Sequence, residues 1–343
     1  MVAALTGTSA EFLIVSLAGA SAAALTGPRV ERLNGFVVAG ATIALMTFAA
    51  SAALAIAAGE SDPAYLARLA GYAVANGSLS AIIAVGTLTV VGYLFGLTTT
   101  LGLNDLAHPT QPLFRRLLTE APGTYHHSVM VANLAERAAE AIGADTLLCR
   151  VGSYYHDIGK LMHPYAFIEN QMGAENIHDR LDPLTSARII GAHVTDGIAL
   201  AQAHRLPDGI RDLIAQHHGT AFIGAFYVRA RQETLRSVDP YDFRYVGPKP
   251  QTKEAAILML ADSVEAAVRA SESHVPEVIE EIVGKIINAR LEQGELDKCD
   301  LTRRDLSQIR ATFLTILHGV YHPRVLYPKP ERQPAPASNT PGA

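Results

Sequence analysis

Seven side chains of two chemical kinds stand out between positions 127 and 262. They are His127, His156, Asp157, His193, His217, His218 and Asp262. Imidazole and carboxylate groups are ligands that proteins offer to first-row divalent metals. Seven of them suffice for two ions, and two neighbouring ions can stabilise both the attacking and the leaving oxygen of a phosphate ester. The residue types therefore indicate metal-dependent hydrolysis of a phosphodiester.

The local settings of these residues strengthen that interpretation. The pair His156-Asp157 ends an apolar helical stretch and is followed by Ile-Gly-Lys, so both ligands should emerge from packed backbone. Asp262 lies inside an apolar string, where a carboxylate without a partner is costly. Taken singly, a histidine on a half-buried helix is more often a structural residue than a ligand. The metal site is favoured over seven separate structural roles because all seven ligand-type residues occur together in one part of the chain.

Charge is distributed very unevenly along the 343 residues. Lys and Arg total 28 and Asp and Glu total 33, yet the first 100 residues contain only seven of these side chains and no histidine. A membrane region tolerates such a composition because each charge in hydrocarbon is expensive. The net charge of −5, without a Lys/Arg cluster, argues against a nucleic-acid surface.

Three apolar runs are candidate membrane spans. The runs from Leu33 to Ala58 and from Leu79 to Leu97 are uncharged and long enough to cross about 30 Å of hydrocarbon. The run from Ser9 to Leu25 is shorter and contains Glu11, so two or three spans are predicted. A signal peptide is the alternative for this first run, but a basic segment before it is missing. Pro63 to Gly77 is predicted to be a short interfacial helix.

Basic residues predict the orientation of these spans. Arg29 and Arg32 lie between the first two runs, and Arg115 and Arg116 follow the third. The positive-inside rule then places everything after Leu97 in the cytosol.

The cytosolic part has the apolar period of helices, with no convincing alternating strands and no internal repeat. One helix is expected to start at Thr124, with only one of His126 and His127 facing the site because neighbours on a helix point about 100° apart. A second covers 147–158 and is closed by Gly159. Further helices are predicted at 187–204, 209–218, 252–271, 276–292 and 302–318. The fold class is all-α, with Thr124, Asp145 and Thr302 as expected N-caps.

Several strings in this part resemble one known family. They are Ala-Pro-Gly-Thr-Tyr-His-His-Ser (121–128), Tyr-Tyr-His-Asp-Ile-Gly-Lys (154–160), Ile-Glu-Asn-Gln (168–171), Gln-His-His-Gly-Thr (216–220), Asp-Phe-Arg-Tyr (242–245) and the segment 247–266. They resemble the seven-transmembrane HD-domain phosphodiesterases, bacterial membrane enzymes that hydrolyse cyclic di-AMP. The resemblance covers about residues 80 to 327. The chain differs from the family in its short N-terminal region, so we expect a shortened or partial membrane region. Whether an outer domain senses a signal is left undecided.

The resemblance implies two divalent ions, iron or manganese, and roles for individual residues. One ion would take His127, His156, Asp157 and Asp262, and the other Asp157, His193, His217 and His218, so that Asp157 bridges them. Asp157 and Lys160 are the expected catalytic residues, because Lys160 lies one turn beyond His156 and should reach a bound phosphate. Expected substrate-binding residues are Lys160, Asn170, Gln171, Arg244 and Lys253. The product would be linear 5′-pApA.

These inferences define a domain organisation. Residues 1–100 form a transmembrane region, 101–118 a juxtamembrane linker, 119–327 an HD phosphohydrolase domain of helices, and 328–343 a disordered Pro-rich tail. The expected protein is a multi-pass signalling enzyme of the plasma membrane with a cytoplasmic catalytic domain. Its partners would be a cyclic dinucleotide and the lipid bilayer, with a homo-oligomer as an option, and neither DNA nor RNA.

Three other functions stay open. Cyclic di-GMP hydrolysis by the related HD-GYP group is disfavoured, because Gly219-Thr220-Ala221-Phe222 stands where that group has Gly-Tyr-Pro. Another nucleotide phosphohydrolase of the HD superfamily is the second alternative. A membrane receptor that binds nucleotide without cutting it is the third, and the complete ligand set argues against it.

Overall fold

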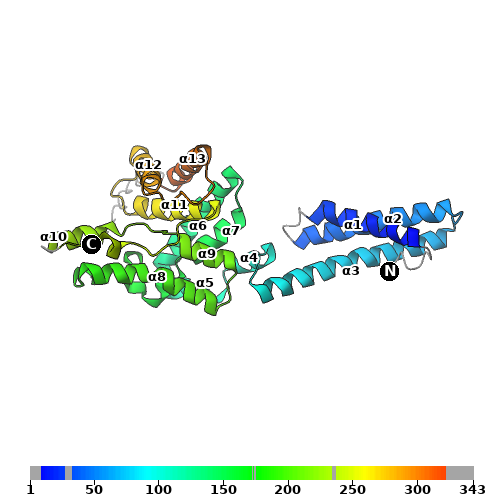
Figure 1. Ribbon diagram of the computed structural model, residues 1–343, viewed down its shortest axis with the longest axis horizontal. Helices are drawn as coiled ribbons and strands as arrows, with labels where there is room; N and C mark the ends of the chain where they lie inside the picture. The colour runs from blue at the N-terminus through cyan, green and yellow to red at the C-terminus, as the bar shows by residue number, and fades with distance from the viewer. Residues whose placement is uncertain (1–8, 28–32, 172, 174, 234–236, 322–343) are drawn as a thin grey trace, which may run out of the picture.

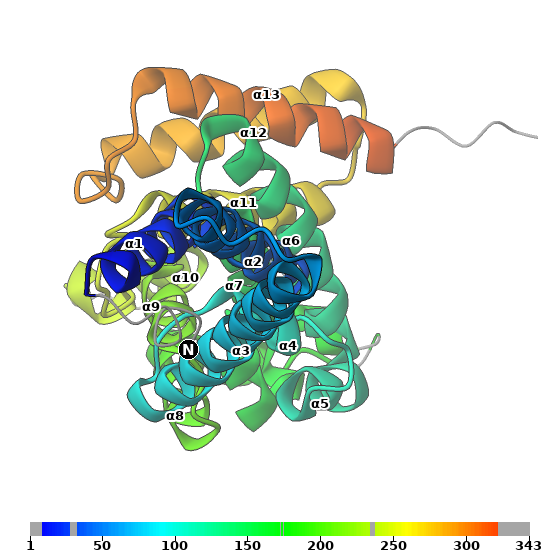
Figure 2. The ribbon, with the colours of Figure 1, turned by 90° about the vertical axis from the view of Figure 1, so that its right-hand side faces the viewer.

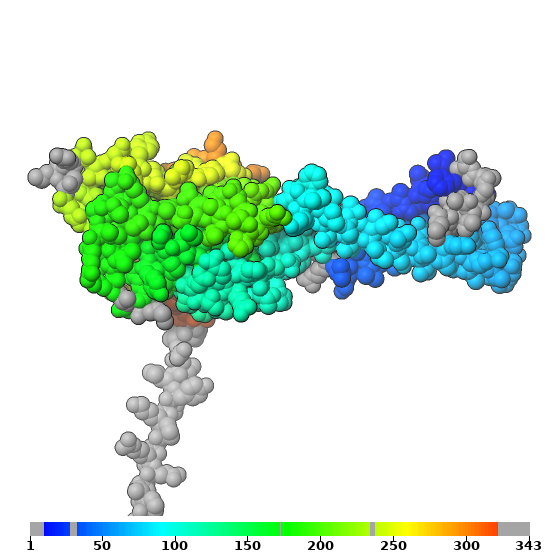
Figure 3. Space-filling model, turned by 90° about the horizontal axis from the view of Figure 1, so that it is seen from below, coloured from blue at the N-terminus to red at the C-terminus, as the bar shows by residue number. Residues whose placement is uncertain are grey.

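The molecule is elongated, with a group of apolar helices at one end and a larger helical body at the other (Figure 1). The computed structural model describes residues 9–27, 33–171, 173, 175–233 and 237–321. Helices α1 (Ser9–Thr26), α2 (Leu33–Ala57) and α3 (Pro63–Phe95) lie side by side. Helix α3 continues toward the body, and a narrow waist separates the two ends (Figure 3).

Two of these helices are long and apolar enough to cross a membrane. The most apolar windows of α2 and α3 are only 17% and 6% buried. Large side chains such as Val37, Ile82 and Leu94 are exposed over 66%, 68% and 68% of their surface. A core helix of a soluble protein would bury such side chains, whereas lipid accepts them. The described surface therefore favours membrane-spanning helices over buried core helices.

The prediction of a separate interfacial helix at Pro63–Gly77 is wrong. This segment and the following apolar run form one helix, α3, with Asp62 as its N-cap and Pro63 in its first turn. Gly77 lies inside α3 and packs against α2, where only glycine fits: a Cβ there would lie 2.1 Å from the carbonyl oxygen of Gly40. At 1.5 Å per residue, α3 is about 50 Å long, so it extends beyond a hydrocarbon layer of about 30 Å.

Two sequence predictions concern residues that the structure does not describe. Arg29 and Arg32, on which the orientation depends, lie outside the described residues, as does the tail from 328 onward. The orientation and the disorder of the tail stay predictions.

The larger body is helical, as predicted. It contains α4 (Thr100–Leu106), α5 (Pro112–Glu120), α6 (Pro122–Ile142), α7 (Thr146–Tyr155), η3 (Ile158–Met162), η4 (Pro164–Ala166), η5 (Ile168–Asn170), η6 (Ile177–Asp179), α8 (Pro183–Ala203), α9 (Asp208–Gln216), α10 (Gly224–Glu233), η7 (Pro240–Phe243), α11 (Lys253–Arg269), α12 (Pro276–Glu292) and α13 (Arg303–Val320). Over the described residues, β structure is limited to one isolated bridge between Phe222 and Arg244. The all-α fold class is confirmed.

Most predicted helices agree with the structure, and the differences have local causes. Asp145 and Thr302 are N-caps as predicted. Thr124 is not, because α6 already starts at Pro122, which suits the first turn of a helix.

Three short helices were not predicted, namely α4 and α5, which overlap the expected linker, and α10. They have 7, 9 and 10 residues. Helices α4 and α5 bury Leu103, Phe114 and Leu117 in the core of the body, so the expected linker belongs to the packed structure.

Helix α11 runs through the middle of the body. Its residues from Ile257 to Leu260 are fully buried, so all sides of this helix are packed. Helices α12 and α13 form an outer layer beside α11 (Figure 2). Because α11 is held on every side, a side chain near its centre has a well-defined position.

Candidate metal centre

The seven predicted ligands converge in one place although they come from five parts of the body. His127 lies on α6, the pair His156-Asp157 directly follows α7, and His193 lies on α8. The pair His217-His218 follows α9, and Asp262 is on α11. His218 is half-buried and the other six are buried. His126 is exposed, which confirms that only His127 of that pair faces inward.

Asp157 lies at the middle of this cluster. Its Oδ2 is 3.2 Å from Nε2 of His156 and 3.5 Å from Nε2 of His127. Its Oδ1 is 3.4 Å from Nε2 of His193 and 3.8 Å from Nε2 of His217. Each carboxylate oxygen therefore faces a different pair of imidazoles, the geometry that a bridging ligand requires.

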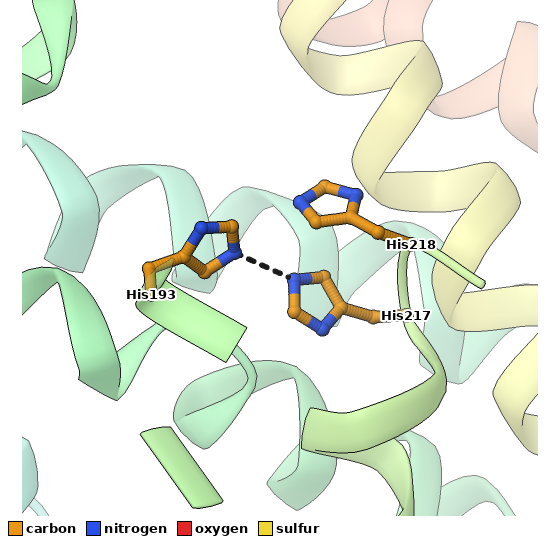
Figure 4. A group of neighbouring side chains, drawn as sticks. All are labelled: His193, His217 and His218. Atoms are coloured by element: carbon orange, nitrogen blue, oxygen red, sulfur yellow. Dashed lines mark hydrogen bonds between the residues drawn. The ribbon is translucent and has the colours of Figure 1, made fainter. Parts of the chain in front are cut away.

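The ligands form two groups. The donor atoms of His127, His156 and Asp157 lie within 4.8 Å of one another, and so do those of His193, His217 and His218. In the second group the three rings converge from two sides, with Nε2 of His193 and Nε2 of His217 3.2 Å apart (Figure 4). Each group is compact enough to surround one ion.

Asp262 contacts both groups. Its Oδ1 is 3.0 Å from Nε2 of His127, and its Oδ2 is 3.5 Å from Nδ1 of His218. The ligand set implied by the resemblance assigns Asp262 to the group of His127 alone, whereas its second oxygen also faces the other group.

Hydrogen bonds to the backbone orient three of the histidines. Nδ1 of His156, His193 and His217 lies 2.8, 2.6 and 2.7 Å from the carbonyl oxygen of the residue three positions earlier. Since a carbonyl only accepts, each Nδ1 donates its proton, which leaves Nε2 to face the centre. This is the arrangement by which proteins orient metal-binding imidazoles.

The unsatisfied polar atoms of the site fit a divalent ion. Within the described structure, Nε2 of His156 and both oxygens of Asp157 are buried without a hydrogen bond. Burial raises the pKa of Asp157, but the positive charges of His156 and Lys160 outweigh this and hold the pKa well below its usual value. A buried, ionised carboxylate that faces four imidazole nitrogens is a donor set that a divalent metal satisfies.

Two histidines of the second group are in the protonation state that ligation needs. Burial and the neighbouring His156 and His193 lower the pKa of His217 to about 3. Burial and His217 likewise lower the pKa of His218 well below its usual value. Both rings are therefore neutral at pH 7, with a lone pair available.

Lys160 is held by two carboxylates. Its Nζ lies 2.8 Å from Oδ2 of Asp157, an ion pair without good hydrogen-bond angles, and donates to Oε1 of Glu169 at 2.7 Å. Burial lowers the pKa of this ammonium, but the two carboxylates outweigh burial and raise it. Lys160 is thus a fixed positive charge beside the central carboxylate.

The other predicted substrate-binding residues have protein partners. Asn170 accepts the backbone N–H of Thr124 at 3.1 Å, and Gln171 donates to the carbonyl of Tyr165 at 3.1 Å. Arg244 donates to the carbonyl of Thr220, two residues beyond His218, at 2.9 Å. Lys253 donates to Asp305 at 3.4 Å and lies at the start of α11, about 13 Å along that helix from Asp262.

Sequence reasoning missed two side chains next to the ligands. Glu265 contacts Nδ1 of His127. Its position one turn after Asp262 in an apolar string was an available signal. The ring of Tyr245 stacks on His218, with centroids 4.1 Å apart. Tyr245 closes one of the quoted strings but has no spacing that points to this contact.

Known proteins share this domain. A family profile described as HD domain matches residues 124–267. Two curated relatives named Cyclic-di-AMP phosphodiesterase PgpH are similar to the chain. The protein from Bacillus subtilis is 46% identical over 256 residues, and that from Listeria monocytogenes is 47% identical over 258. These alignments cover 75% of this chain but 36% of each relative, so the chain spans little more than a third of their length.

Solved structures agree with the sequence comparison. Crystal structures of the L. monocytogenes phosphodiesterase PgpH HD domain, one of them in complex with cyclic di-AMP, are 47% identical to this chain. Their TM-scores are 0.60 and 0.61, and the match covers 62% of this chain and 100% of the solved domain. With its metal-binding geometry and its full-length match to that domain, the chain belongs to the PgpH-type HD-domain family.

Proposed function

We propose that the chain is a membrane-anchored, metal-dependent phosphodiesterase that hydrolyses cyclic di-AMP to linear 5′-pApA. The observation that carries this proposal is the two-sided environment of Asp157, whose oxygens each face two imidazole nitrogens. The substrate follows from the 47% identical HD domain that has been solved in complex with cyclic di-AMP.

The proposed ligand sets are His127, His156, Asp157 and Asp262 for one ion, and Asp157, His193, His217 and His218 for the other. When bound, two divalent ions, iron or manganese, supply a hydroxide at neutral pH and neutralise charge on the phosphate. The buried Asp157 holds the two ligand groups at a fixed separation. Lys160 adds a fixed positive charge where negative charge accumulates on the phosphate. Side-chain nucleophiles are not required, so a covalent enzyme intermediate is not expected.

We also propose roles for Lys160, Asn170, Gln171, Arg244 and Lys253 in binding the dinucleotide. Lys160 has the strongest support because its ammonium lies beside Asp157. Asn170 and Arg244 are supported by their hydrogen bonds to segments that carry ligands. Lys253 has the weakest support, because it pairs with Asp305.

The proposed location is the plasma membrane, with several spans and a cytoplasmic catalytic domain. The exposed apolar surfaces of α2 and α3 support the anchoring. The positive-inside rule supports the cytoplasmic side. An enzyme placed there would remove a cytosolic signalling dinucleotide.

A product assay tests this function. The full chain in detergent would be incubated with cyclic di-AMP or cyclic di-GMP, each with Mn²⁺ or Fe²⁺, and the products separated by chromatography. We expect 5′-pApA from cyclic di-AMP and little product from cyclic di-GMP. Metal-loaded protein that leaves cyclic di-AMP intact, or that prefers cyclic di-GMP, would contradict the proposal.

A further inference from the structure

Two buried glutamates lie outside the proposed ligand set, one against a ligand and one against the turn after the histidine pair. Glu265 is on α11 and 3% exposed, and Glu295 is in the connection from α12 to α13 and fully buried. A buried carboxylate is costly unless strong hydrogen bonds or charges satisfy it. The partners of each glutamate therefore indicate what it does.

Glu265 bonds directly to a proposed ligand. Its Oε2 accepts from Nδ1 of His127, and Nε of Arg269 lies 3.1 and 3.3 Å from its two oxygens. In His156, His193 and His217, Nε2 also faces the centre, but Nδ1–H donates to a backbone carbonyl. His127 differs because the partner of its Nδ1 is a carboxylate. The bond turns Nε2 of His127 toward Asp157, and a carboxylate makes the imidazole a better electron donor to a metal.

Glu295 holds the turn that follows the histidine pair. Its Oε2 accepts the backbone N–H of Thr220 at 2.9 Å, and its Oε1 accepts the Thr220 hydroxyl at 2.6 Å. The chain turns at Gly219 with a φ of +54°, and a Cβ there would lie 2.2 Å from Oε2 of Glu295. Thr220 is two residues beyond His218, so these two hydrogen bonds fix the position of the pair His217-His218 after the end of α9.

Glu295 also lies outside the segment that the HD-domain profile matches, which ends at residue 267. The loop that carries it is itself anchored, because Lys249 donates to the carbonyl of Gly294 at 2.8 Å. The connection between α12 and α13 thus contacts the turn that follows the histidine pair.

We propose that Glu265 and Glu295 are positioning residues of the metal centre. Glu265 orients His127 in one half, and Glu295 locks the turn of His217 and His218 in the other. This inference rests on the proposed metal centre but not on the identity of the nucleotide.

The test measures metal binding without substrate. The full chain in detergent would be titrated with Mn²⁺, following the rise of its thermal unfolding midpoint, and bound metal would be counted by mass spectrometry. Removing a side chain that supports metal ligands typically costs about 10- to 100-fold in metal affinity, so we expect losses of this size for Glu265→Ala and Glu295→Ala. The exposed residues Glu272 and Glu292 provide matched alanine controls, which should bind Mn²⁺ like the wild type.

A conservative variant separates positioning from general stability. Glu295→Gln should stay within about twofold of wild-type affinity, because its amide oxygen can accept the Thr220 N–H while its NH₂ donates to the hydroxyl. Thr220→Val removes one of the two bonds and should weaken Mn²⁺ binding even if Glu295→Ala does not fold.

Wild-type Mn²⁺ affinity in both alanine variants, with only the metal-free unfolding midpoint lowered, would overturn the inference. A wild-type chain that binds Mn²⁺ but does not cleave cyclic di-AMP would instead contradict the proposed function alone.

Discussion

The contact between Gly159 and α8 should be as important as the ligands themselves. Gly159 lies two residues after Asp157, and a Cβ on it would be 1.8 Å from the carbonyl oxygen of His193 and 2.5 Å from the backbone nitrogen of Gly197. Ordinary contact begins at 3.4 Å, so Gly159→Ala must push the segment after Asp157 away from α8 by about 1.5 Å. The two elements that move apart carry Asp157 and His193, one ligand from each group.

A misplacement of about 1 Å can lower a catalytic rate about 100-fold, and overpacking costs about 1–3 kcal/mol of stability. We therefore expect Gly159→Ala to lose at least about 100-fold in kcat for cyclic di-AMP while part of the protein remains folded. The assay is product formation at saturating Mn²⁺, with thermal unfolding measured on the same preparation.

Gly191→Ala is the matched control, because Gly191 lies on α8, the helix that Gly159 faces, and a Cβ there would meet only Ile223 at 3.8 Å. It should keep full activity and gain up to about 1 kcal/mol of stability, since alanine favours a helix. Wild-type activity in Gly159→Ala would refute the reasoning, because it would mean that the spacing between Asp157 and α8 does not control the centre.

Three further outcomes follow from the same geometry. Asp157→Ala should abolish both metal retention and turnover, and full activity with two bound ions, measured by metal analysis, would exclude a bridging role. Lys160→Ala leaves Asp157 and Glu169 buried without their cation, so the metal-free chain should lose about 3–5 kcal/mol in denaturant unfolding, and a loss below about 1 kcal/mol would show that the ion pairs are not needed. Chelation should lower the unfolding midpoint, and Mn²⁺ at 100 times its Kd should restore about 2.7 kcal/mol for each bound ion; a midpoint unchanged by both treatments would argue against a metal centre.

The apolar runs and the helical periods could be read from the sequence because they are local patterns. Helix α12 has the bounds that its pattern predicted, and α2 differs by one residue. The continuity of α3 could not be read in the same way. Glycine at position 77 looks like a break until Gly40 is known to pack against it.

The ligand types were also visible in the sequence, since histidine and aspartate in apolar settings are unusual enough to indicate a metal site. Their partners were not visible, because those contacts join distant residues. His127 and Glu265 are 138 positions apart, and Thr220 and Glu295 are 75 apart. The role predicted for Lys160 shows the same limit: spacing placed it near the site, but only the fold revealed that Asp157 and Glu169 hold it.

The sequence by itself thus determined the all-α class, the apolar N-terminal region and the identity of the seven candidate ligands. Composition and short-range periodicity are properties of neighbouring residues, and they survive without a fold. Only the tertiary structure showed how the oxygens of Asp157 and Asp262 face both ligand groups. It also showed that Glu265 bonds to His127 and that Glu295 bonds to the turn after His218. These features depend on how α6, α8, α9 and α11 pack around a common centre, and packing is set by contacts between residues far apart in the chain.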